Sequence, residues 1–310
     1  MTQIDLITGF LGSGKTTFIK KYAAWLIEKG YRIGILENDM GAVNVDMMLL
    51  NSLEGDQCEL EMISGGCDQE THRRRFRTKL IAMGMCGYDR VLIEPSGVFD
   101  MDEFFDLLHD EPLDQWYTIG NVIAIADAGL EDVLSDEADY VLASEAACAG
   151  RIVLSRTKEV TPQKAAGTVK HIEQALQKIK CGRSLEGAVV SRGWDTFTDA
   201  DFEELSSCGY VNASYVKRDL SGESGFESKF FLHVQLGQKE LERQIRKLMK
   251  DPACGTVFRI KGFFRNENGG WMELNATKEQ MEIRPSSAGQ EVLIAVGEGL
   301  HQEAMERYLY

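Results

Sequence analysis

Positive charge and proline are both scarce in this sequence. Its 310 residues contain 34 Lys and Arg against 49 Asp and Glu, so the formal net charge is −15 and nonspecific attraction to nucleic acid or anionic lipid is not expected. With five prolines, 44% hydrophobic and 27% charged residues, the composition is globular rather than disordered or fibrous. At roughly 100 to 200 residues per domain, the chain can form one large or two ordinary domains.

Long apolar runs and a basic leader are also missing. No stretch approaches the roughly 20 apolar residues that span a bilayer, and the start, MTQIDLITGF, passes at once into a strand-like run. We therefore expect a cytoplasmic protein with no membrane partner. The seven cysteines are an odd number without framework spacing, which predicts mostly free thiols. Ser-His-Asp, HExxH and CxxC arrangements are absent, so the chemistry that they carry is not predicted.

Short apolar runs alternate with segments of helical period from residue 1 to about 210. This alternation is typical of βαβ units, and it predicts an α/β fold with a doubly wound, mostly parallel sheet covered by helices. The strands that we expect are 3–9, 32–37, 90–94, 122–127 and 151–155. One expected helix carries an apolar stripe for the core, formed by Phe18, Ile19, Tyr22, Ala23 and Leu26.

A stretch rich in Ser and Gly at 206–228 predicts a linker. After it, 230–236 alternates apolar and polar residues, a helix follows with Leu241, Ile245 and Leu248, and short strands lead to a last helix at 301–309. This pattern predicts a smaller α+β domain. We therefore expect two domains, over residues 1–212 and 226–310.

The clearest motif follows the first expected strand. Residues 9–16, GFLGSGKT, fit G-x-x-x-x-G-K-[ST] and open a helix, as a phosphate-binding loop (P-loop) does. In such a loop backbone N–H groups and the helix N-terminus face the phosphates, Lys15 bridges the outer phosphates, and the Thr16 hydroxyl binds Mg²⁺. The nucleotide-binding residues expected here are Gly12, Ser13, Gly14, Lys15, Thr16 and Thr17. Domain 1–212 is thus predicted to bind a nucleoside triphosphate.

A second polar segment ends a buried strand, where 91–97 reads VLIEPSG. A triphosphate site needs a carboxylate at such a strand end, to hold Mg²⁺ or its water, and a backbone N–H near the γ-phosphate. Glu94 is the expected metal-side carboxylate. Gly97 is the expected γ-phosphate sensor, in a loop that moves when this phosphate leaves.

The loop 37–46, ENDMGAVNVD, is a candidate switch segment. Asp39 and Asp46 can reach Mg²⁺ or an attacking water from it, and solvated loop acids without a role are the equal alternative. The predicted catalytic residues are therefore Lys15, Asp46 and Glu94, and the predicted Mg²⁺ ligands are Thr16, Asp39 and Glu94.

The order GFLGSGKTT, NDMGAVNVD, SGGC and IEPSG resembles the CobW-like family of P-loop GTPases, relatives of the nickel-inserting urease and hydrogenase GTPases. RIKGFF (259–264) and VLIAVGEGLHQEAMERYL (292–309) extend the resemblance to that family's second domain. It implies the P-loop NTPase fold, GTP and Mg²⁺ binding, and slow hydrolysis that drives a conformational switch. It further implies a metalloprotein or corrinoid-protein client that is matured or reactivated, and it leaves homo-oligomerisation open.

The metal motif departs from this family. Where relatives have Cys-x-Cys-Cys, the chain reads Cys67-Asp68-Gln69-Glu70, so one thiol is left. Zinc and cobalt sites of this kind use several soft or borderline ligands. Cys67 is the candidate ligand for Zn or Co, and a plain thiol is the alternative.

The base motif departs as well. Where relatives have Asn-Lys-x-Asp, residues 155–158 read Ser-Arg-Thr-Lys. A lysine only donates hydrogen bonds, so Lys158 cannot accept those from the N1–H and amino group of guanine. Ser155, Arg156 and Lys158 are the expected base-side residues, and the choice between GTP and ATP stays open.

Two other function classes remain open. A P-loop also serves small-molecule kinases, although no arginine-rich lid or acceptor pocket is recognisable here. A module that binds nucleotide or metal without turnover is compatible with the replaced ligands at 69, 70, 155 and 158. Slow hydrolysis is expected because no arginine or glutamine is recognisably placed after Gly97 to assist it.

Overall fold

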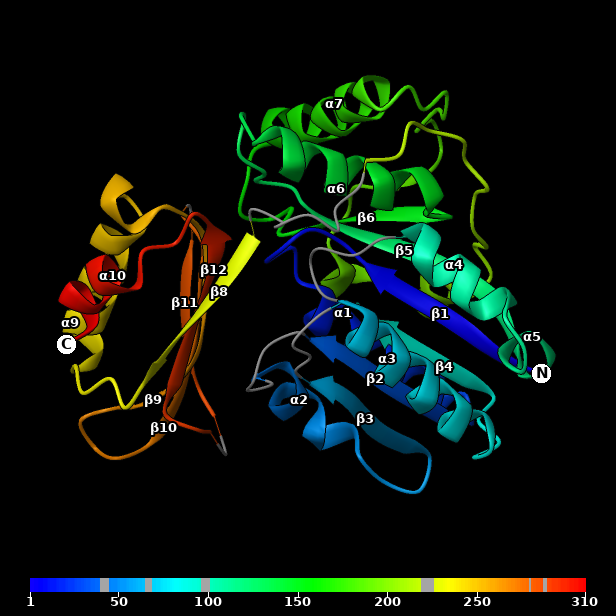
Figure 1. The fold of residues 1–310 in the computed structure, drawn as a ribbon, viewed down its shortest axis with the longest axis horizontal. Helices are drawn as coiled ribbons and strands as arrows, with labels where there is room; N and C mark the ends of the chain where they lie inside the picture. Colours follow the sequence, from blue (N-terminus) through cyan, green and yellow to red (C-terminus); the bar gives the residue numbers. More distant parts are fainter. Residues whose placement is uncertain (40–44, 65–68, 96–100, 219–225, 279, 287–288) are drawn as a thin grey trace. The chain divides into compact units, whose positions relative to one another are not determined.

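The computed structural model describes the chain outside residues 40–44, 65–68, 96–100, 219–225, 279 and 287–288 (Figure 1). The chain divides into two compact units, Met1–Leu220 and Ser221–Tyr310. This division falls within the Ser- and Gly-rich stretch. Among the described residues, no helix has the length and apolar character needed to cross a bilayer.

The first unit is built on a seven-stranded sheet in the order β3-β2-β4-β1-β5-β6-β7, and all of its strand pairs are parallel. Its strands are β1 (Thr2–Thr8), β2 (Ile33–Asp39), β3 (Cys58–Ser64), β4 (Arg90–Glu94), β5 (Tyr117–Asp127), β6 (Arg151–Ser155) and β7 (Val189–Val190). The α/β doubly wound prediction is confirmed. Strand β1 lies between β4 and β5, so the P-loop leaves the middle of the sheet.

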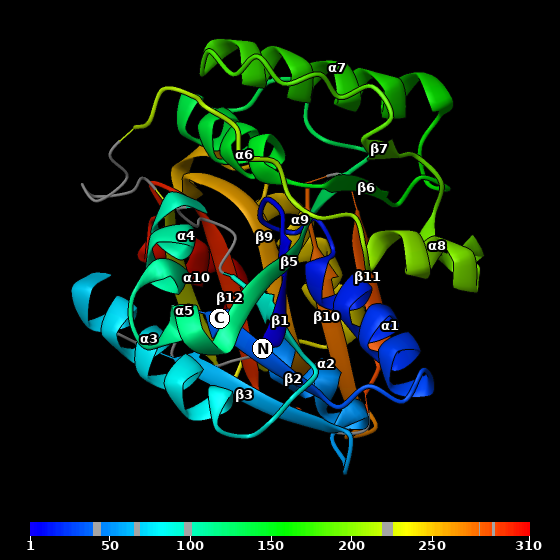
Figure 2. The same cartoon turned by 90° about the vertical axis from the view of Figure 1, so that its right-hand side faces the viewer.

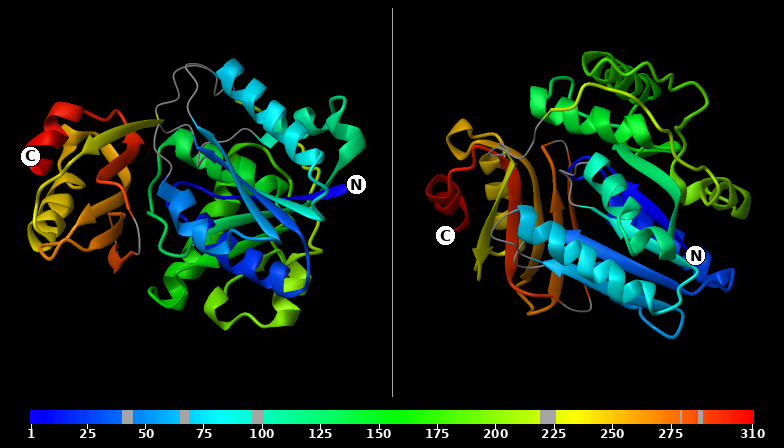
Figure 3. Two further views of the ribbon diagram at one scale, coloured as in Figure 1. Left: turned by 90° about the horizontal axis from the view of Figure 1, so that it is seen from below. Right: turned by 45° about the vertical axis from the view of Figure 1, so that its right-hand side comes forward.

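Helices cover both faces of this sheet. They are α1 (Lys15–Glu28), α2 (Val45–Leu50), α3 (Gln69–Gly84), α4 (Met101–His109), α5 (Leu113–Trp116), α6 (Asp136–Cys148), α7 (Pro162–Lys178) and α8 (Asp199–Leu205). Helices α1, α2 and α8 share one hydrophobic core, to which the predicted α1 stripe contributes. On the opposite face, α3 contacts β3, and α4, α5 and α6 contact β5 (Figure 3). Helix α7 packs against α6 (Figure 2).

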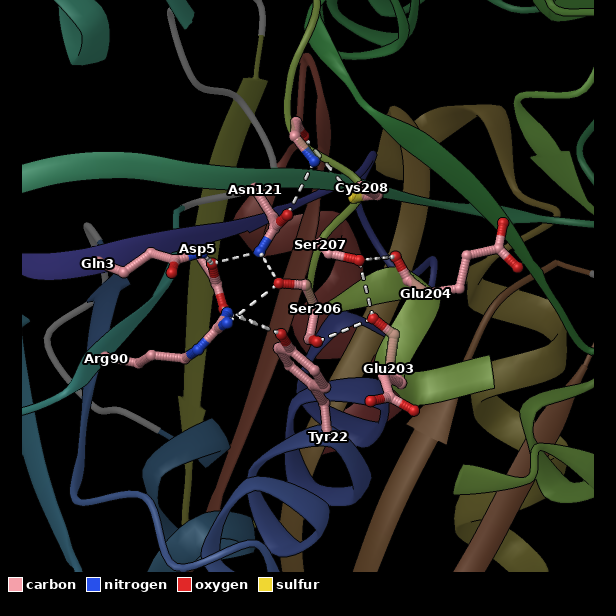
Figure 4. A network of polar contacts seen from close by, with 11 residues as sticks. Gln3, Asp5, Tyr22, Arg90, Asn121, Glu203, Glu204, Ser206, Ser207 and Cys208 are labelled. Carbon is pink, nitrogen blue, oxygen red and sulfur yellow. Dashed lines mark hydrogen bonds and ion pairs between the residues drawn. The ribbon is translucent and has the colours of Figure 1, made fainter. Parts of the chain in front are cut away.

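A buried carboxylate, Asp5, belongs to a polar network that connects the central strands to α1 and to the end of α8 (Figure 4). Its Oδ2 accepts from Arg90 Nη1 of β4 at 2.6 Å and from the Tyr22 hydroxyl of α1 at 2.9 Å. Its Oδ1 accepts from Asn121 Nδ2 of β5 at 2.7 Å. Arg90 Nη2 in turn donates to the carbonyl oxygen of Ser206 at 3.0 Å. Burial raises the pKa of Asp5, and Arg90 opposes this shift.

The chain beyond α8 is tied to the first unit at several points. The amide N–H of Gly209 donates to Asn121 Oδ1 at 2.8 Å, and its carbonyl oxygen accepts from the Val122 N–H at 3.0 Å. Farther along, the Arg218 N–H donates to the Tyr140 hydroxyl of α6 at 2.9 Å. The last described residue of this unit is therefore still hydrogen-bonded to its helical layer.

The second unit is a five-stranded antiparallel sheet in the order β11-β10-β9-β12-β8. Its elements are β8 (Phe226–Leu232), α9 (Gln238–Leu248), β9 (Thr256–Arg265), β10 (Trp271–Ala276), β11 (Met281–Pro285), β12 (Val292–Glu298) and α10 (Gln302–Leu309). Helices α9 and α10 share one hydrophobic core with the sheet (Figure 1). The predicted α+β class is confirmed.

One strand prediction in this unit is wrong in its bounds. The alternation of apolar and polar residues over 230–236 is typical of a strand, whereas β8 ends at Leu232. His233 has a left-handed backbone with a φ of +56°, which an extended strand cannot contain. Val234 and Leu236 nevertheless pack against the core. The apolar residues therefore continue to alternate beyond the end of the strand because they still contact the core.

Candidate nucleotide-binding site

The P-loop connects β1 to α1 through a backbone that glycine allows. Gly9, Gly12 and Gly14 have φ values of +145°, +77° and +101°, which side-chain-bearing residues rarely adopt. A Cβ on Gly9 would also lie 2.2 Å from the carbonyl oxygen of Ile125 on β5. The loop therefore turns closely against the neighbouring strand, at the carboxyl edge of the sheet where α/β proteins bind ligands.

Lys15 is buried at the first position of α1. Its Nζ donates to the carbonyl oxygen of Gly9 at 2.8 Å, so the side chain extends back from α1 over the P-loop. The first helical hydrogen bond runs from the Phe18 N–H to the Gly14 carbonyl oxygen at 3.0 Å. The preceding N–H groups have no acceptor within the helix, which is the usual arrangement of an anion site at a helix N-terminus.

Thr16 and Glu94 meet although 78 residues separate them in the sequence. The Thr16 hydroxyl donates to Glu94 Oε1 at 2.9 Å, and each residue is 5% exposed. Parallel pairing of β1 with β4 brings the start of α1 beside the end of β4. The structure thus places together the hydroxyl and the carboxylate that the sequence assigns to Mg²⁺.

Glu37 is a second buried carboxylate at this edge, and it is not among the site residues predicted from the sequence. It lies opposite Glu94 in the β2–β4 register, so both side chains emerge on one face of the sheet. Residues 37–39 were expected in the loop 37–46, whereas β2 continues to Asp39. The available signal for Glu37 was its position at the end of an apolar run.

Several predicted residues cannot be placed by their side chains. Asp39 ends β2 and Asp46 lies in the first turn of α2, and the side chains of both are outside the described part. Gly97 and Cys67 are outside the described residues altogether. Within the described residues, no group of three or more His, Cys, Asp or Glu side chains is arranged to hold a metal ion.

The predicted base-side segment follows β6 and contacts the P-loop. Ser155 is buried, and Arg156 has a left-handed backbone with a φ of +52°. Arg156 Nη2 donates to the carbonyl oxygen of Gly12 at 2.9 Å, and Nη1 forms an ion pair with Asp127 at the end of β5. Asp127 was missed in the sequence, where it looked like the polar end of a strand.

Lys158 lies on the exposed side of the same segment. Its Nζ is 3.7 Å from Oδ2 of Asp195, a residue of the 3₁₀ turn Trp194–Thr196 that follows β7. A Cβ on Gly14 would lie 3.2 Å from Cη2 of Trp194, so this turn reaches the P-loop. Trp194 and Asp195 carry no motif that would identify them in the sequence.

Glu145 of α6 lies behind the P-loop and is 1% exposed. Its Oε1 accepts from the Thr8 hydroxyl at 2.9 Å, and the Gly9 N–H also donates to this carboxyl group. Burial raises the pKa of Glu145 to about 7, although the Lys15 charge and these two hydrogen bonds oppose the shift. The apolar surroundings of Glu145 in the sequence concealed this contact.

A comparison with protein families identifies similarity within the first unit. The family "CobW/HypB/UreG, nucleotide-binding domain" matches residues 3–185. The zinc chaperone YjiA of Escherichia coli is 29% identical over 185 residues, covering 57% of this chain and 54% of the relative. The zinc chaperone YeiR of the same organism is 31% identical over 179 residues, covering 57% and 51%. The chain thus spans about half the length of these two relatives.

Two wider matches cover nearly the whole chain. The zinc-regulated GTPase metalloprotein activator 1 of Schizosaccharomyces pombe is 21% identical, covering 92% of this chain and 77% of the relative. The crystal structure of Zn(II)-bound YjiA GTPase from E. coli is 20% identical and covers 99% and 97%, with a TM-score of 0.38. The family match, by contrast, spans more than half of the chain and includes the P-loop, Glu94 and Ser155–Lys158. The chain therefore belongs to the CobW/HypB/UreG family of nucleotide-binding proteins.

Proposed function

We propose that the first unit, predicted as domain 1–212, binds a nucleoside triphosphate with Mg²⁺ and hydrolyses it slowly. The observation that carries this proposal is the hydrogen bond between Thr16 and Glu94 beside the buried Lys15. GTP is the expected nucleotide, because relatives are named as GTPases. The nucleotide is proposed to switch the protein between two conformations that act on a client.

The residues at the loop fit a magnesium nucleotide. Mg²⁺ prefers oxygen ligands, and the Thr16 hydroxyl and the Glu94 carboxylate offer two buried oxygen groups next to the phosphate cradle. When bound, the cation neutralises charge on the β- and γ-phosphates. Lys15 exchanges its hydrogen bond to Gly9 for the phosphates, while the N–H groups at the start of α1 orient them. Asp46 and Gly97 remain the proposed water-orienting acid and γ-phosphate sensor.

The proposal is tested by calorimetric titration with GTP and ATP, with and without Mg²⁺. Lys15→Ala is expected to weaken binding at least tenfold, since a charge-assisted hydrogen bond to phosphate is lost. Lys20→Ala removes an exposed lysine from the same helix and serves as the matched control. Equal binding by the parent and Lys15→Ala contradicts the assignment. Measurement of free phosphate then distinguishes the three functions. A hydrolase releases free phosphate, a kinase yields a phosphorylated acceptor instead, and a module without turnover yields neither.

The metal-related part of the proposal rests on the relatives. YjiA and YeiR are named as zinc chaperones, and the S. pombe relative as a zinc-regulated metalloprotein activator. We propose that this chain likewise serves a metalloprotein or corrinoid-protein client, with Zn or Co as cargo held partly by Cys67. Zinc or cobalt titration of Cys67→Ser against Cys86→Ser, a half-buried free cysteine, tests this. Identical metal affinity in the two variants contradicts a role of Cys67.

A further inference from the structure

Two loops meet beside the P-loop, on the side where Arg156 contacts it. One follows β6 and carries Lys158, and the other follows β7 and carries Trp194 and Asp195. The Trp194 ring packs against Phe18 of α1 with a centroid separation of 5.8 Å, and Lys21 Nζ lies 2.8 Å from Asp195 Oδ1. Two successive turns of α1 therefore hold the second loop in place.

Lys158 and Asp195 present opposite hydrogen-bonding characters to solvent. Their side chains are 64% and 57% exposed and lie 3.7 Å apart, Nζ to Oδ2. A carboxylate offers about four lone-pair positions, and the hydrogen bond from Lys21 uses one of them, so about three are left. The hydrogen bond from Lys21 keeps the pKa of Asp195 below its usual range, which maintains the acceptor form.

We propose that Lys158 and Asp195 together read the base of the nucleotide and select guanine. Asp195 then supplies, from the loop after β7, the acceptor that position 158 lacks. Guanine offers two neighbouring donors, N1–H and the 2-amino group, to the carboxylate, and its O6 accepts from the ammonium. Adenine offers only one amino donor on this edge, so it makes one hydrogen bond fewer to the carboxylate. This inference rests on the proposed function.

A purely structural role makes a different prediction. Lys21, Asp195 and Lys158 would then be a surface ion-pair network that holds the turn, and such exposed pairs contribute little to stability. Removing the Asp195 charge would in that case affect all purine nucleotides equally. The ratio of affinities for two bases, rather than either affinity alone, distinguishes the two roles.

The experiment compares calorimetric affinities for GTP, ATP, ITP and XTP in Mg²⁺ between the parent and Asp195→Asn. The parent is expected to prefer GTP over ATP, and over ITP, which lacks the 2-amino group. Asp195→Asn is expected to weaken GTP about tenfold to a hundredfold, because the amide NH2 group replaces one of the two acceptors and faces a guanine donor. ATP binding should weaken less than threefold. XTP binding should strengthen, because the new amide donates to the xanthine 2-carbonyl oxygen.

The matched control is Asp199→Asn, which removes a neighbouring exposed aspartate that also pairs with an α1 lysine, Lys29, at 2.8 Å. It is expected to leave all four affinities unchanged. A parent that prefers ATP, or an Asp195→Asn variant with an unchanged GTP-to-ATP ratio, overturns the base assignment while nucleotide binding stands. A parent that binds none of the four nucleotides refutes the proposed function and this inference together.

Discussion

Arg156 Nη2 donates to the carbonyl oxygen of Gly12 over 2.9 Å, which joins the end of β6 to the P-loop across 144 residues of sequence. The same guanidinium pairs with Asp127, so one side chain connects the ends of two neighbouring strands to the loop. A non-glycine residue with a φ of +52° is strained, and these contacts hold it there.

Loss of the Arg156 side chain should therefore loosen the P-loop. We expect Arg156→Ala to weaken nucleotide binding about tenfold to a hundredfold, since hydrogen bonds to a charged group contribute about 1.5 to 3 kcal/mol. Arg151→Ala removes an arginine of the same segment that pairs with Glu204, and serves as the control. Calorimetric titration measures both, and equal affinities in the two variants would contradict the role of Arg156.

The contact between Thr16 and Glu94 predicts how nucleotide affinity depends on magnesium. Glu94→Gln keeps an oxygen that accepts from Thr16, so the fold should persist, but the carboxylate charge is lost. We expect Mg²⁺ to strengthen nucleotide binding in the parent and to have little effect in the variant. The ratio of affinities in Mg²⁺ and in EDTA measures this, with Glu61→Gln on the edge strand β3 as the control. A full Mg²⁺ effect in Glu94→Gln argues against the assignment.

Glu145 predicts a pH dependence of folding stability. Its pKa is about 7 in the folded chain against 4.5 for the ordinary group, so the folded state binds the proton more tightly. The free energy of unfolding should fall by about 3 kcal/mol as pH rises from roughly 4.5 to 7, and level off above. Urea unfolding at several pH values measures this slope.

Glu145→Gln removes the titrating group while preserving an acceptor for the Thr8 hydroxyl. The variant should lose the slope between pH 4.5 and 7 and exceed the parent in stability at pH 8. Glu137→Gln changes an exposed acid on the same helix and should retain the slope. If Glu145→Gln retains the full slope, another group is responsible.

The buried pair of Asp5 and Arg90 predicts an asymmetric response to mutation. Arg90→Ala leaves the Asp5 charge buried without its cation, which should lower the free energy of unfolding by about 3 to 5 kcal/mol. Asp5→Asn combined with Arg90→Met should cost less, because no unpaired charge remains. Lys79→Ala, which breaks a half-exposed pair with Glu61, should cost at most about 1 kcal/mol. Chemical denaturation measures the free energy of unfolding of the three variants. A double variant that loses as much stability as Arg90→Ala, or more, would contradict the pairing.

In the first unit, the strands that could be predicted from the sequence are those buried on both faces. In β4 every residue is buried, and its three central residues, Val91, Leu92 and Ile93, form an apolar run. Edge strand β3 alternates Glu59 and Glu61 with apolar residues, and β7 has only two residues, so neither produced such a run. Strand length and burial therefore decide how visible an element is.

In the site, residues that are contiguous in the sequence could be predicted, and residues that only the fold brings together could not. The P-loop could be predicted because its glycines, Lys15 and Thr16 are contiguous. Asp127, Glu145 and Asp195 join it only through the strand order and the loops that this order brings together, which no single segment encodes. Thr8 and Glu145, for example, are 137 residues apart in the sequence.

Helix α6 holds the chain at two points five residues apart. Tyr140 binds the backbone of Arg218, the last described residue before the second unit, and Glu145 binds Thr8 at the start of the P-loop. At 1.5 Å rise per residue this separation is only about 8 Å of helix. An α-helix is stiff over this length, so we expect a displacement of the backbone at Arg218 to shift Thr8 and the start of the P-loop as well.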